Sequence, residues 1–192
     1  MHGKGTYVFS NGNKYEGEWF EDLKNGYGVL YYLNGERYEG FWENDKAHGK
    51  GTLTYIHGDK YVGDFRSALK HGKGDLFYAN GDTFSGEWKN DRANGQGVLV
   101  YANGNKYEGN WKDDRVHHIV IVYSYSQRSG WGVFSTPDGT RYEGEWENNK
   151  KEGKGTLYFA TGDTYVAVWK DGLSVSGTYN FSTDSVWSNP EL

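Results

Sequence analysis

Glycine-lysine segments are the first candidates for chemistry in this 192-residue chain. Gly49-Lys50-Gly51-Thr52 contains the residue types that bind phosphate in nucleotide-binding loops. Such a loop needs the order Gly-x4-Gly-Lys-[Ser/Thr] followed by a helix, because its backbone amides and its lysine surround the phosphates together. The segment has neither that order nor a helical pattern after it. We therefore interpret these glycines as structural.

Acidic side chains recur at regular places rather than in one cluster. Glu16, Glu39 and Glu143 occupy the same place in a repeated pattern. A catalytic acid–base pair is a single constellation, whereas periodic carboxylates are typical of a solvated sheet surface. The sequence therefore predicts no catalytic residue and a protein that is not an enzyme.

Histidine and cysteine do not form a metal-binding pattern. The chain has no cysteine, which excludes thiolate zinc sites and disulfides. His117 and His118 are adjacent, and neighbouring strand residues point to opposite faces, which suits shared metal ligation poorly. His48 and His71 each precede a glycine at the same place in the pattern. We expect neither a metal nor a cofactor.

Composition excludes further classes of protein. The chain has 29 Gly, 8 Trp, 17 Tyr and 9 Phe but only 2 Pro, which argues against both collagen and a disordered chain. Its net charge of −5 gives no general attraction to nucleic acid. No apolar run approaches the roughly 20 residues that span a bilayer, and no apolar signal-peptide core follows Met1. We expect a cytoplasmic protein without a nucleic-acid partner.

A 23-residue repeat positions all of these side chains. It is marked by Gly-x-Gly pairs at Gly3/Gly5, Gly26/Gly28, Gly49/Gly51, Gly72/Gly74, Gly95/Gly97, Gly130/Gly132 and Gly153/Gly155. The one longer step contains an insertion, which we place at residues 118–129. The sequence therefore predicts one array over residues 1–192, with about seven repeats and a degenerate C-terminal copy.

Each repeat has the two-residue period of β-strands. Val29–Tyr32 and Arg37–Trp42 are β-prone runs joined by Asn34-Gly35, a strong hairpin signal. The pattern predicts an all-β fold, an elongated single-layer twisted antiparallel sheet of consecutive β-hairpins. Gly40, between Tyr38 and Trp42, is expected to leave space for an aromatic ring, and the Gly-x-Gly pair is expected to form the tight bend between hairpins.

These motifs resemble the MORN (membrane occupation and recognition nexus) repeat. The family pattern Tyr-x-Gly-x-Trp followed by a polar turn and His-Gly-x-Gly matches Tyr38–Trp42 through His48–Gly51. Further matches to its first part occur at residues 15–19, 107–111 and 142–146. The resemblance implies a scaffold, a dimerisation array or a targeting module. Residues 166–181 are similar to the last repeat of small MORN proteins of cilia and flagella, which implies a cytoskeletal or axonemal setting.

The first functional hypothesis is a protein-interaction scaffold, an aromatic-lined ribbon that clamps a peptide or helix of a partner. Self-association into a larger assembly is a variant of this hypothesis. The candidate partner-binding residues on the aromatic face are Trp19, Tyr38, Trp42, Tyr61, Trp88, Tyr107, Trp111 and Trp146.

Two alternatives remain. A stripe of basic loops could bind phosphoinositide headgroups on a membrane, although acidic residues in the same loops offset its charge. The candidate headgroup ligands are Lys46, Lys50, Lys70, Lys73, Lys150 and Lys154.

The second alternative is a regulatory array for an enzyme in another chain.

The insertion is the one non-repetitive feature. It contains the apolar and aromatic side chains Ile119, Ile121, Tyr123 and Tyr125. It is an enlarged hairpin connection, a break in the curvature of the ribbon, or a contact for a partner, because exposed apolar patches mark contact sites.

Overall fold

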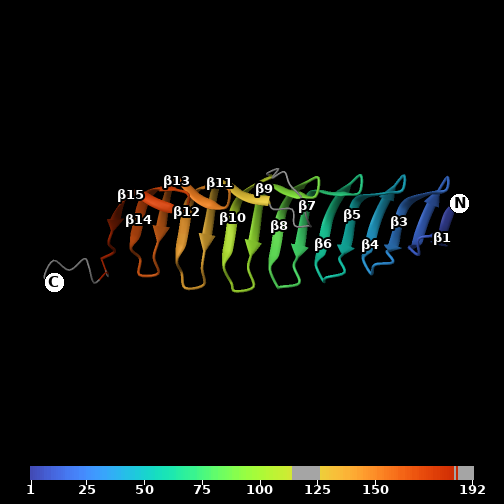
Figure 1. Ribbon diagram of the computed structural model, residues 1–192, viewed down its shortest axis with the longest axis horizontal. Coiled ribbons are helices and arrows are strands. Elements are labelled where there is room, and N and C mark those ends of the chain that lie inside the picture. The colour runs from blue at the N-terminus through green and yellow to red at the C-terminus, as the bar shows by residue number, and fades with distance from the viewer. Residues whose placement is uncertain (114–125, 184, 186–192) are drawn as a thin grey trace. The chain divides into compact units, whose positions relative to one another are not determined.

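The computed structural model describes residues 1–113, 126–183 and 185. The chain divides into two compact units, Met1–Ala93 and Asn94–Leu192, and we describe each by itself. All regular structure in the described residues is β-strand (Figure 1).

The first unit contains β1 (Gly3–Val8), β2 (Lys14–Phe20), β3 (Leu23–Tyr31), β4 (Arg37–Glu43), β5 (Lys46–Thr54), β6 (Lys60–Arg66), β7 (Leu69–Phe77) and β8 (Thr83–Lys89). β9 (Arg92–Val100) begins at the unit boundary. The second unit continues with β10 (Lys106–Asp113), β11 (Ser126–Ser135), β12 (Arg141–Glu147), β13 (Lys150–Tyr158), β14 (Thr164–Lys170) and β15 (Leu173–Asn180).

Within each unit every strand pairs with the next one along the chain, always antiparallel. This order follows from the connections of two and five residues that alternate along most of the array, because loops this short join neighbouring antiparallel strands. The all-β array of consecutive hairpins is therefore confirmed.

The hairpin turn forms where the Asn-Gly signal predicted it. The Tyr32 amide donates to the Glu36 carbonyl oxygen at 2.9 Å, and the Gly35 amide donates to the Tyr32 carbonyl oxygen at 3.0 Å. Gly35 has φ 93°, which glycine adopts without steric cost. The Asn34 Oδ1 atom accepts the Glu36 amide at 3.0 Å, so the asparagine stabilises the turn through its own side chain.

The bend between hairpins lies elsewhere than predicted. It consists of Asn44 and Asp45, with φ 47° and 67°, and not of the Gly-x-Gly pair. Gly49 and Gly51 lie inside β5, next to a register shift between Gly40 and Trp42 on β4. The predicted place of the bend was wrong because asparagine and aspartate also tolerate the left-handed region, and two such residues complete a tight hairpin turn. The positive φ expected within the Gly-x-Gly pair is present at Gly49, with φ 70°.

Glycines from successive strands form a row beneath the tyrosine rings. Gly40 pairs with Gly28 on one side and with Gly51 on the other. A Cβ atom at Gly40 would lie 2.5 Å from the Gly51 Cα and 2.8 Å from the Tyr38 hydroxyl. The Tyr38 hydroxyl reaches past the row and donates to the Phe41 carbonyl oxygen at 3.0 Å. The expected space for a ring is confirmed, and the ring that fills it belongs to the same strand.

The core of each unit is a column of these rings. Tyr38 contacts Trp42 of its own repeat at 5.0 Å between centroids and Phe65 of the next repeat at 4.9 Å, both edge to face. In the second unit Tyr142 contacts Trp146 and Trp169 in the same way, at 5.3 and 5.4 Å. Edge-to-face pairs add about 0.5–1.5 kcal/mol beyond the burial of their surface, so the column holds adjacent repeats together.

The last full repeat departs from this geometry. Ala167 replaces the usual glycine, and its Cβ would lie only 2.7 Å from a Cβ atom at Gly177. The Tyr165–Trp169 centroid distance lengthens to 6.3 Å, and the Tyr165 hydroxyl donates to Ser174 Oγ rather than to a backbone carbonyl. The Tyr165 ring still lies over Gly177, where a Cβ atom would be 2.6 Å from its Cζ atom, but its hydroxyl no longer reaches past the row.

Candidate interaction site

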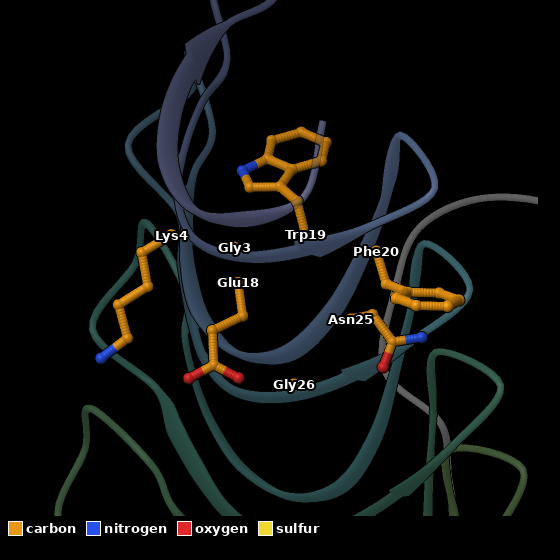
Figure 2. Close-up of a pocket in the computed structure, with 7 residues that line it drawn as sticks. All are labelled: Gly3, Lys4, Glu18, Trp19, Phe20, Asn25 and Gly26. Atoms are coloured by element: carbon orange, nitrogen blue, oxygen red, sulfur yellow. The ribbon is translucent and has the colours of Figure 1, made fainter.

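We call the face that bears Tyr15, Gly17 and Trp19, with their equivalents, the inner face, and the opposite one the outer face. Figure 2 shows the Trp19 ring inside the bend of the strands, with the Glu18 side chain on the other side of its strand. All eight sequence-selected aromatic residues are buried, with exposures of 0–9%. They are Trp19, Tyr38, Trp42, Tyr61, Trp88, Tyr107, Trp111 and Trp146. Their rings are therefore part of the core as well as of the inner face.

Hydrogen bonds fix the orientation of the tryptophans. Trp42 Nε1 donates to the Gly28 carbonyl oxygen at 3.2 Å, and Trp88 Nε1 donates to that of Gly74 at 2.9 Å. In the second unit Trp146 Nε1 donates to Gly132 at 3.1 Å. A buried indole N–H needs such an acceptor. The inner face is consequently a preorganised surface rather than a set of adaptable side chains.

Basic side chains lie over these rings, and this arrangement was not predicted from the sequence. Lys24 Nζ lies 5.2 Å from the centroid of the Trp42 ring and 3.0 Å from Asp45 Oδ1. Lys70, only 9% exposed, lies 5.1 Å from the Trp88 centroid and donates to the Tyr55 hydroxyl at 3.0 Å.

The second unit repeats the arrangement with an arginine and a lysine. Arg128 lies 4.4 Å from the Trp146 centroid, and Lys151 Nζ lies 4.5 Å from the Trp169 centroid. Burial lowers the pKa of both side chains, because the charged form loses hydration. The sequence signal was a basic residue two positions before the Gly-x-Gly pair, replaced by alanine in alternate repeats of the first unit at Ala47 and Ala93.

The six expected headgroup ligands do not form a uniform stripe. Lys70 is buried on the inner face, Lys50 forms an ion pair with Asp64 at 2.7 Å, and Lys150 forms one with Asp171 at 2.9 Å. The remaining three are exposed: Lys46, Lys73 and Lys154. Membrane binding through these loops therefore stays a prediction, supported by these three exposed amines.

Most of the insertion lies outside the described residues. The candidate contact residues Ile119, Ile121, Tyr123 and Tyr125 lie outside the described residues, and so do the adjacent histidines His117 and His118. Its last residues, 126–129, belong to β11, where Arg128 pairs with Trp111 of β10. The hypothesis of a partner contact in this segment stays a prediction.

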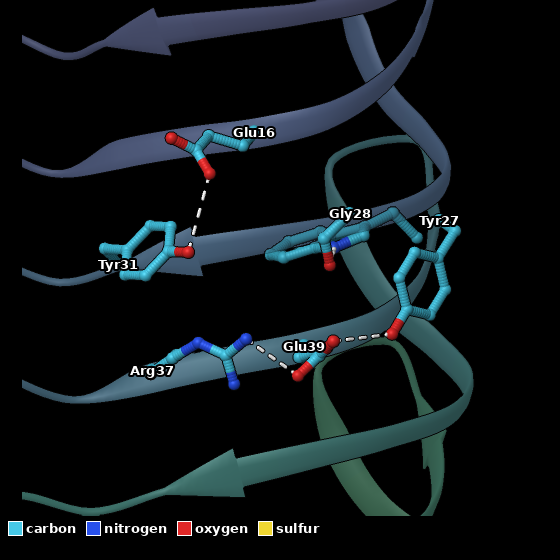
Figure 3. Close-up of polar contacts among 7 residues, drawn as sticks. Glu16, Tyr27, Gly28, Tyr31, Arg37 and Glu39 are labelled. Carbon is cyan, nitrogen blue, oxygen red and sulfur yellow. Dashed lines mark hydrogen bonds and ion pairs between the residues drawn. The ribbon is translucent and has the colours of Figure 1, made fainter.

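The outer face carries polar networks rather than a catalytic constellation. Tyr27 donates to Glu39 at 2.8 Å and Arg37 pairs with the same carboxylate at 2.7 Å, while Tyr31 approaches Glu16 at 3.5 Å (Figure 3). The hydrogen bonds from Tyr27 and Arg37 lower the pKa of Glu39 below its usual value. A carboxylate that already accepts two donors and holds its charge is poorly suited to accept a substrate proton.

A shallow hollow of about 610 Å³ lies at the first two hairpins (Figure 2). Its lining is Gly3, Lys4, Glu18, Trp19, Phe20, Asn25 and Gly26. One carboxylate and one amine on neighbouring strands do not provide an acid–base pair with a nucleophile. Among the residues that the structure describes, no group of three His, Cys, Asp or Glu side chains is arranged to hold a metal ion. The described part of the chain also contains no helix of the length and apolarity needed to cross a bilayer.

Comparison with known families decides the identity of the repeat. The MORN repeat model matches residues 1–14, 15–37, 38–60, 61–83, 84–106, 107–117 and 142–164. The chain belongs to the MORN repeat family. The five matches that begin at residues 15, 38, 61, 84 and 142 start at the strand of the Tyr-x-Gly-x-Trp motif or its variants, so each of these five spans the second strand of one hairpin and the first strand of the next. No match to a curated protein sequence was found.

Two solved structures are similar to this MORN protein at low sequence identity and with TM-scores below 0.5. The TCP domain of SAS-4 (dCPAP) from Drosophila melanogaster, solved in complex with a proline-rich motif of Ana2 (dSTIL), is 14% identical, with a TM-score of 0.47 over 86% of this chain and 78% of that one. The wild-type TCP10 domain of CPAP from Danio rerio is 12% identical, with a TM-score of 0.31 over 92% of this chain and 89% of that one.

Proposed function

We propose that this MORN protein is a non-enzymatic protein-interaction scaffold whose inner face holds an extended peptide or a helix of a partner. The observation that carries the proposal is the repetition of one rigid aromatic arrangement from hairpin to hairpin. Tyr15 to Trp42, Tyr61 to Trp88 and Tyr107 to Trp146 are edge-to-face contacts at 5.4, 5.2 and 5.3 Å. A preorganised aromatic surface loses little side-chain entropy when a partner binds, so more of the contact energy remains as binding free energy.

The partner segment would contact the half-buried rings above the fully buried ones. Tyr32 and Tyr55 follow β3 and β5 directly, are only partly buried and border the inner face. Tyr55 stacks on His57 at 5.5 Å and accepts a hydrogen bond from Lys70. Such amphipathic rings are typical of binding hot spots. The buried tryptophans below them, such as Trp42 and Trp88, would act as a rigid floor.

We propose a cilium, a flagellum or another cytoskeletal assembly as the setting, supported by the similarity of residues 166–181 to the last repeat of small ciliary MORN proteins. Membrane recruitment through Lys46, Lys73 and Lys154 is the alternative, and regulation of an enzyme in another chain is a further one. Sedimentation with phosphoinositide vesicles at two salt concentrations tests the first alternative. Salt-sensitive binding that is lost when these three lysines become glutamine would support it over the scaffold.

The scaffold proposal is tested with two matched double variants of the full chain. Tyr32→Ala/Tyr55→Ala removes two inner-face rings, and Tyr27→Ala/Phe41→Ala removes two outer-face rings that are 44% and 50% exposed. Affinity purification with crosslinking should recover partners with the wild type and the outer-face variant and lose them with the inner-face variant. Equal recovery by both variants, at matched thermal stability, would show that the inner face is not the binding surface.

A further inference from the structure

Among the described residues, every basic side chain over the inner-face rings except one has a polar group of the chain that satisfies its charged end. Lys24 Nζ pairs with Asp45 Oδ1 at 3.0 Å. Arg128 Nη2 donates to the Asn149 carbonyl oxygen at 2.9 Å. Lys70 Nζ donates to the Tyr55 hydroxyl at 3.0 Å. The rings below supply apolar surface, and these acceptors compensate for lost hydration.

The acceptors come from two fixed places in the repeat. The first is the second residue of the turn between hairpins, at Asp45 and Asn149, whose side chains also accept the amides of Lys24 and Arg128, each at 2.9 Å. The second is the aromatic residue 15 positions before the lysine, at Tyr55 for Lys70.

Lys151 has neither acceptor. At the first place, Gly172 carries no side chain, and in the described residues Lys151 Nζ forms no hydrogen bond with the Gly172 carbonyl oxygen of the kind that Arg128 forms with that of Asn149. The residue at the second place is Thr136. The Thr136 hydroxyl is bonded to Asp138 and to the Thr140 carbonyl oxygen. Across the described ranges, the Lys151 ammonium contacts only ring faces, those of Tyr142 at 4.7 Å and Trp169 at 4.5 Å.

A half-buried ammonium above two rings, without an acceptor from the chain, favours an anion from outside. Burial weakens its hydration, and the pKa of Lys151 is lowered for that reason. The matching site at Lys24 shows which anion fits the geometry, because there a carboxylate, Asp45, occupies the place beside the amine. A phosphate would need further cations, whereas the neighbouring Lys150 is already paired with Asp171 at 2.9 Å.

We propose that Lys151 binds the carboxylate of an aspartate or glutamate in the partner segment that lies on the inner face of the second unit. The inference rests on the proposed scaffold function and adds the chemistry of the partner. The acidic side chain takes the place that Asp45 occupies beside Lys24, with the rings of Tyr142 and Trp169 beneath the pair.

Short random peptides displayed on phage are the probe, selected against the full-length chain. Peptides selected by the wild type should share an Asp or Glu at a fixed position. Changing that residue to Asn or Gln should weaken binding to the wild type about tenfold and leave binding to Lys151→Met unchanged, as expected for a charge-assisted hydrogen bond. Lys151→Arg should retain the acidic preference, and Lys150→Met serves as the matched control with wild-type behaviour.

A gain-of-acceptor variant tests the same idea without touching the lysine. Gly172 has φ 87° and no heavy atom within 4 Å of a Cβ position, and Asp45 adopts the equivalent conformation at φ 67°. Gly172→Asp should supply the missing carboxylate within the chain and abolish the preference for acidic peptides. Gly172→Ala controls for the backbone change and should leave the preference intact.

The outcomes of these experiments distinguish a failure of this inference from a failure of the proposed scaffold function. Peptides that bind the inner face without any acidic preference, or with one that survives Lys151→Met, would overturn the inference and leave the scaffold proposal standing. The absence of any inner-face binder would overturn both. Lys151-dependent binding of inorganic phosphate or phosphoinositide vesicles, without binding of acidic peptides, would show that the occupant is a phosphate and that the inference is wrong.

Discussion

Trp42 Nε1 donates a hydrogen bond to the carbonyl oxygen of Gly28, which lies 14 residues earlier and on the neighbouring strand. The same bond recurs with the same spacing at Trp19–Gly5, Trp88–Gly74 and Trp146–Gly132. The bond ties each hairpin's aromatic strand to the glycine row of the strand before it. The Trp42 ring that this bond fixes also packs edge to face on Tyr15 of the preceding hairpin, at 5.4 Å between centroids. Contacts of this second kind join stacked hairpins, whereas one hairpin alone would be only marginally stable.

Trp88 separates the contribution of this bond from that of the ring. Trp88→Ala should destabilise the fold by about 3–5 kcal/mol, because it leaves a cavity under Lys70 and beside Tyr61. Trp88→Phe should cost only about 1 kcal/mol, because a ring remains and one hydrogen bond is lost. Phe65 already occupies the equivalent place and keeps the edge-to-face contacts. Urea unfolding measures both, and equal losses would contradict this division.

The glycine row predicts intolerance to a single methyl group. Gly40→Ala places a Cβ 2.5 Å from the Gly51 Cα and 2.6 Å from the Lys50 carbonyl oxygen, and neither backbone atom can move freely. We expect destabilisation of about 1–3 kcal/mol or more, measured as a lowered thermal midpoint. Gly5→Ala is the control, because its nearest contact is the flexible end of Met1 at 2.9 Å. A Gly40→Ala midpoint as high as that of the control would show that the row is not tightly packed.

A substitution in the turn that contains Ala68 is predicted to increase the stability of the protein. Ala68 adopts φ 68°, a conformation that costs alanine about 1–2 kcal/mol, and it offers no acceptor where Asp45 and Asn149 provide one. Ala68→Asn should stabilise the protein by about 1 kcal/mol, which corresponds to about 2–4 °C in the thermal midpoint for a chain of this size. Ala79→Asn, in an exposed turn without positive φ, should leave the midpoint unchanged. A lowered midpoint for Ala68→Asn would exclude this account of the turn.

The buried tyrosines predict unfolding in alkali. Burial raises the pKa of Tyr15 and Tyr142 to about 12 and raises that of Tyr38, Tyr61 and Tyr107 further. The unfolded chain releases these protons near pH 10, about the ordinary value for tyrosine, while the folded chain keeps them. The contribution of these tyrosines to stability is therefore constant below about pH 10 and falls as the pH rises above it.

Phenolate absorbance and near-ultraviolet circular dichroism should change together in that range, in one cooperative step. Tyr142→Phe keeps the ring and removes one ionising group, so it should shift the alkaline midpoint upward. Titration of all phenols near pH 10 with an unchanged dichroism signal would contradict the assignment of these rings to the core.

The sequence by itself determined the strands, their order and the two faces. The two-residue period assigns Tyr15, Gly17 and Trp19 to one face, and the Asn34-Gly35 signal sets the hairpin register, because both are local properties of the backbone. The glycine between Tyr38 and Trp42 predicted a space for a ring, because only glycine lacks the atom that would fill it. The position of the tight bend was not determined, since Asn44, Asp45 and Gly49 all adopt positive φ. Only the strand register shows that the two-residue turn lies at Asn44 and Asp45 and that Gly49 lies inside β5, beside a register shift.

The tertiary structure alone decided the place of the basic side chains and the depth of the rings. A lysine at position 24 or 151 has the sequence appearance of a solvated loop residue. Its place over rings depends on a tyrosine from the strand before it and a tryptophan from the strand after it. Whether its charge is satisfied depends on a turn 21 residues away, at Asp45 for Lys24 and at Gly172 for Lys151. Contacts between neighbouring repeats set these relations, and no property of a single repeat contains them.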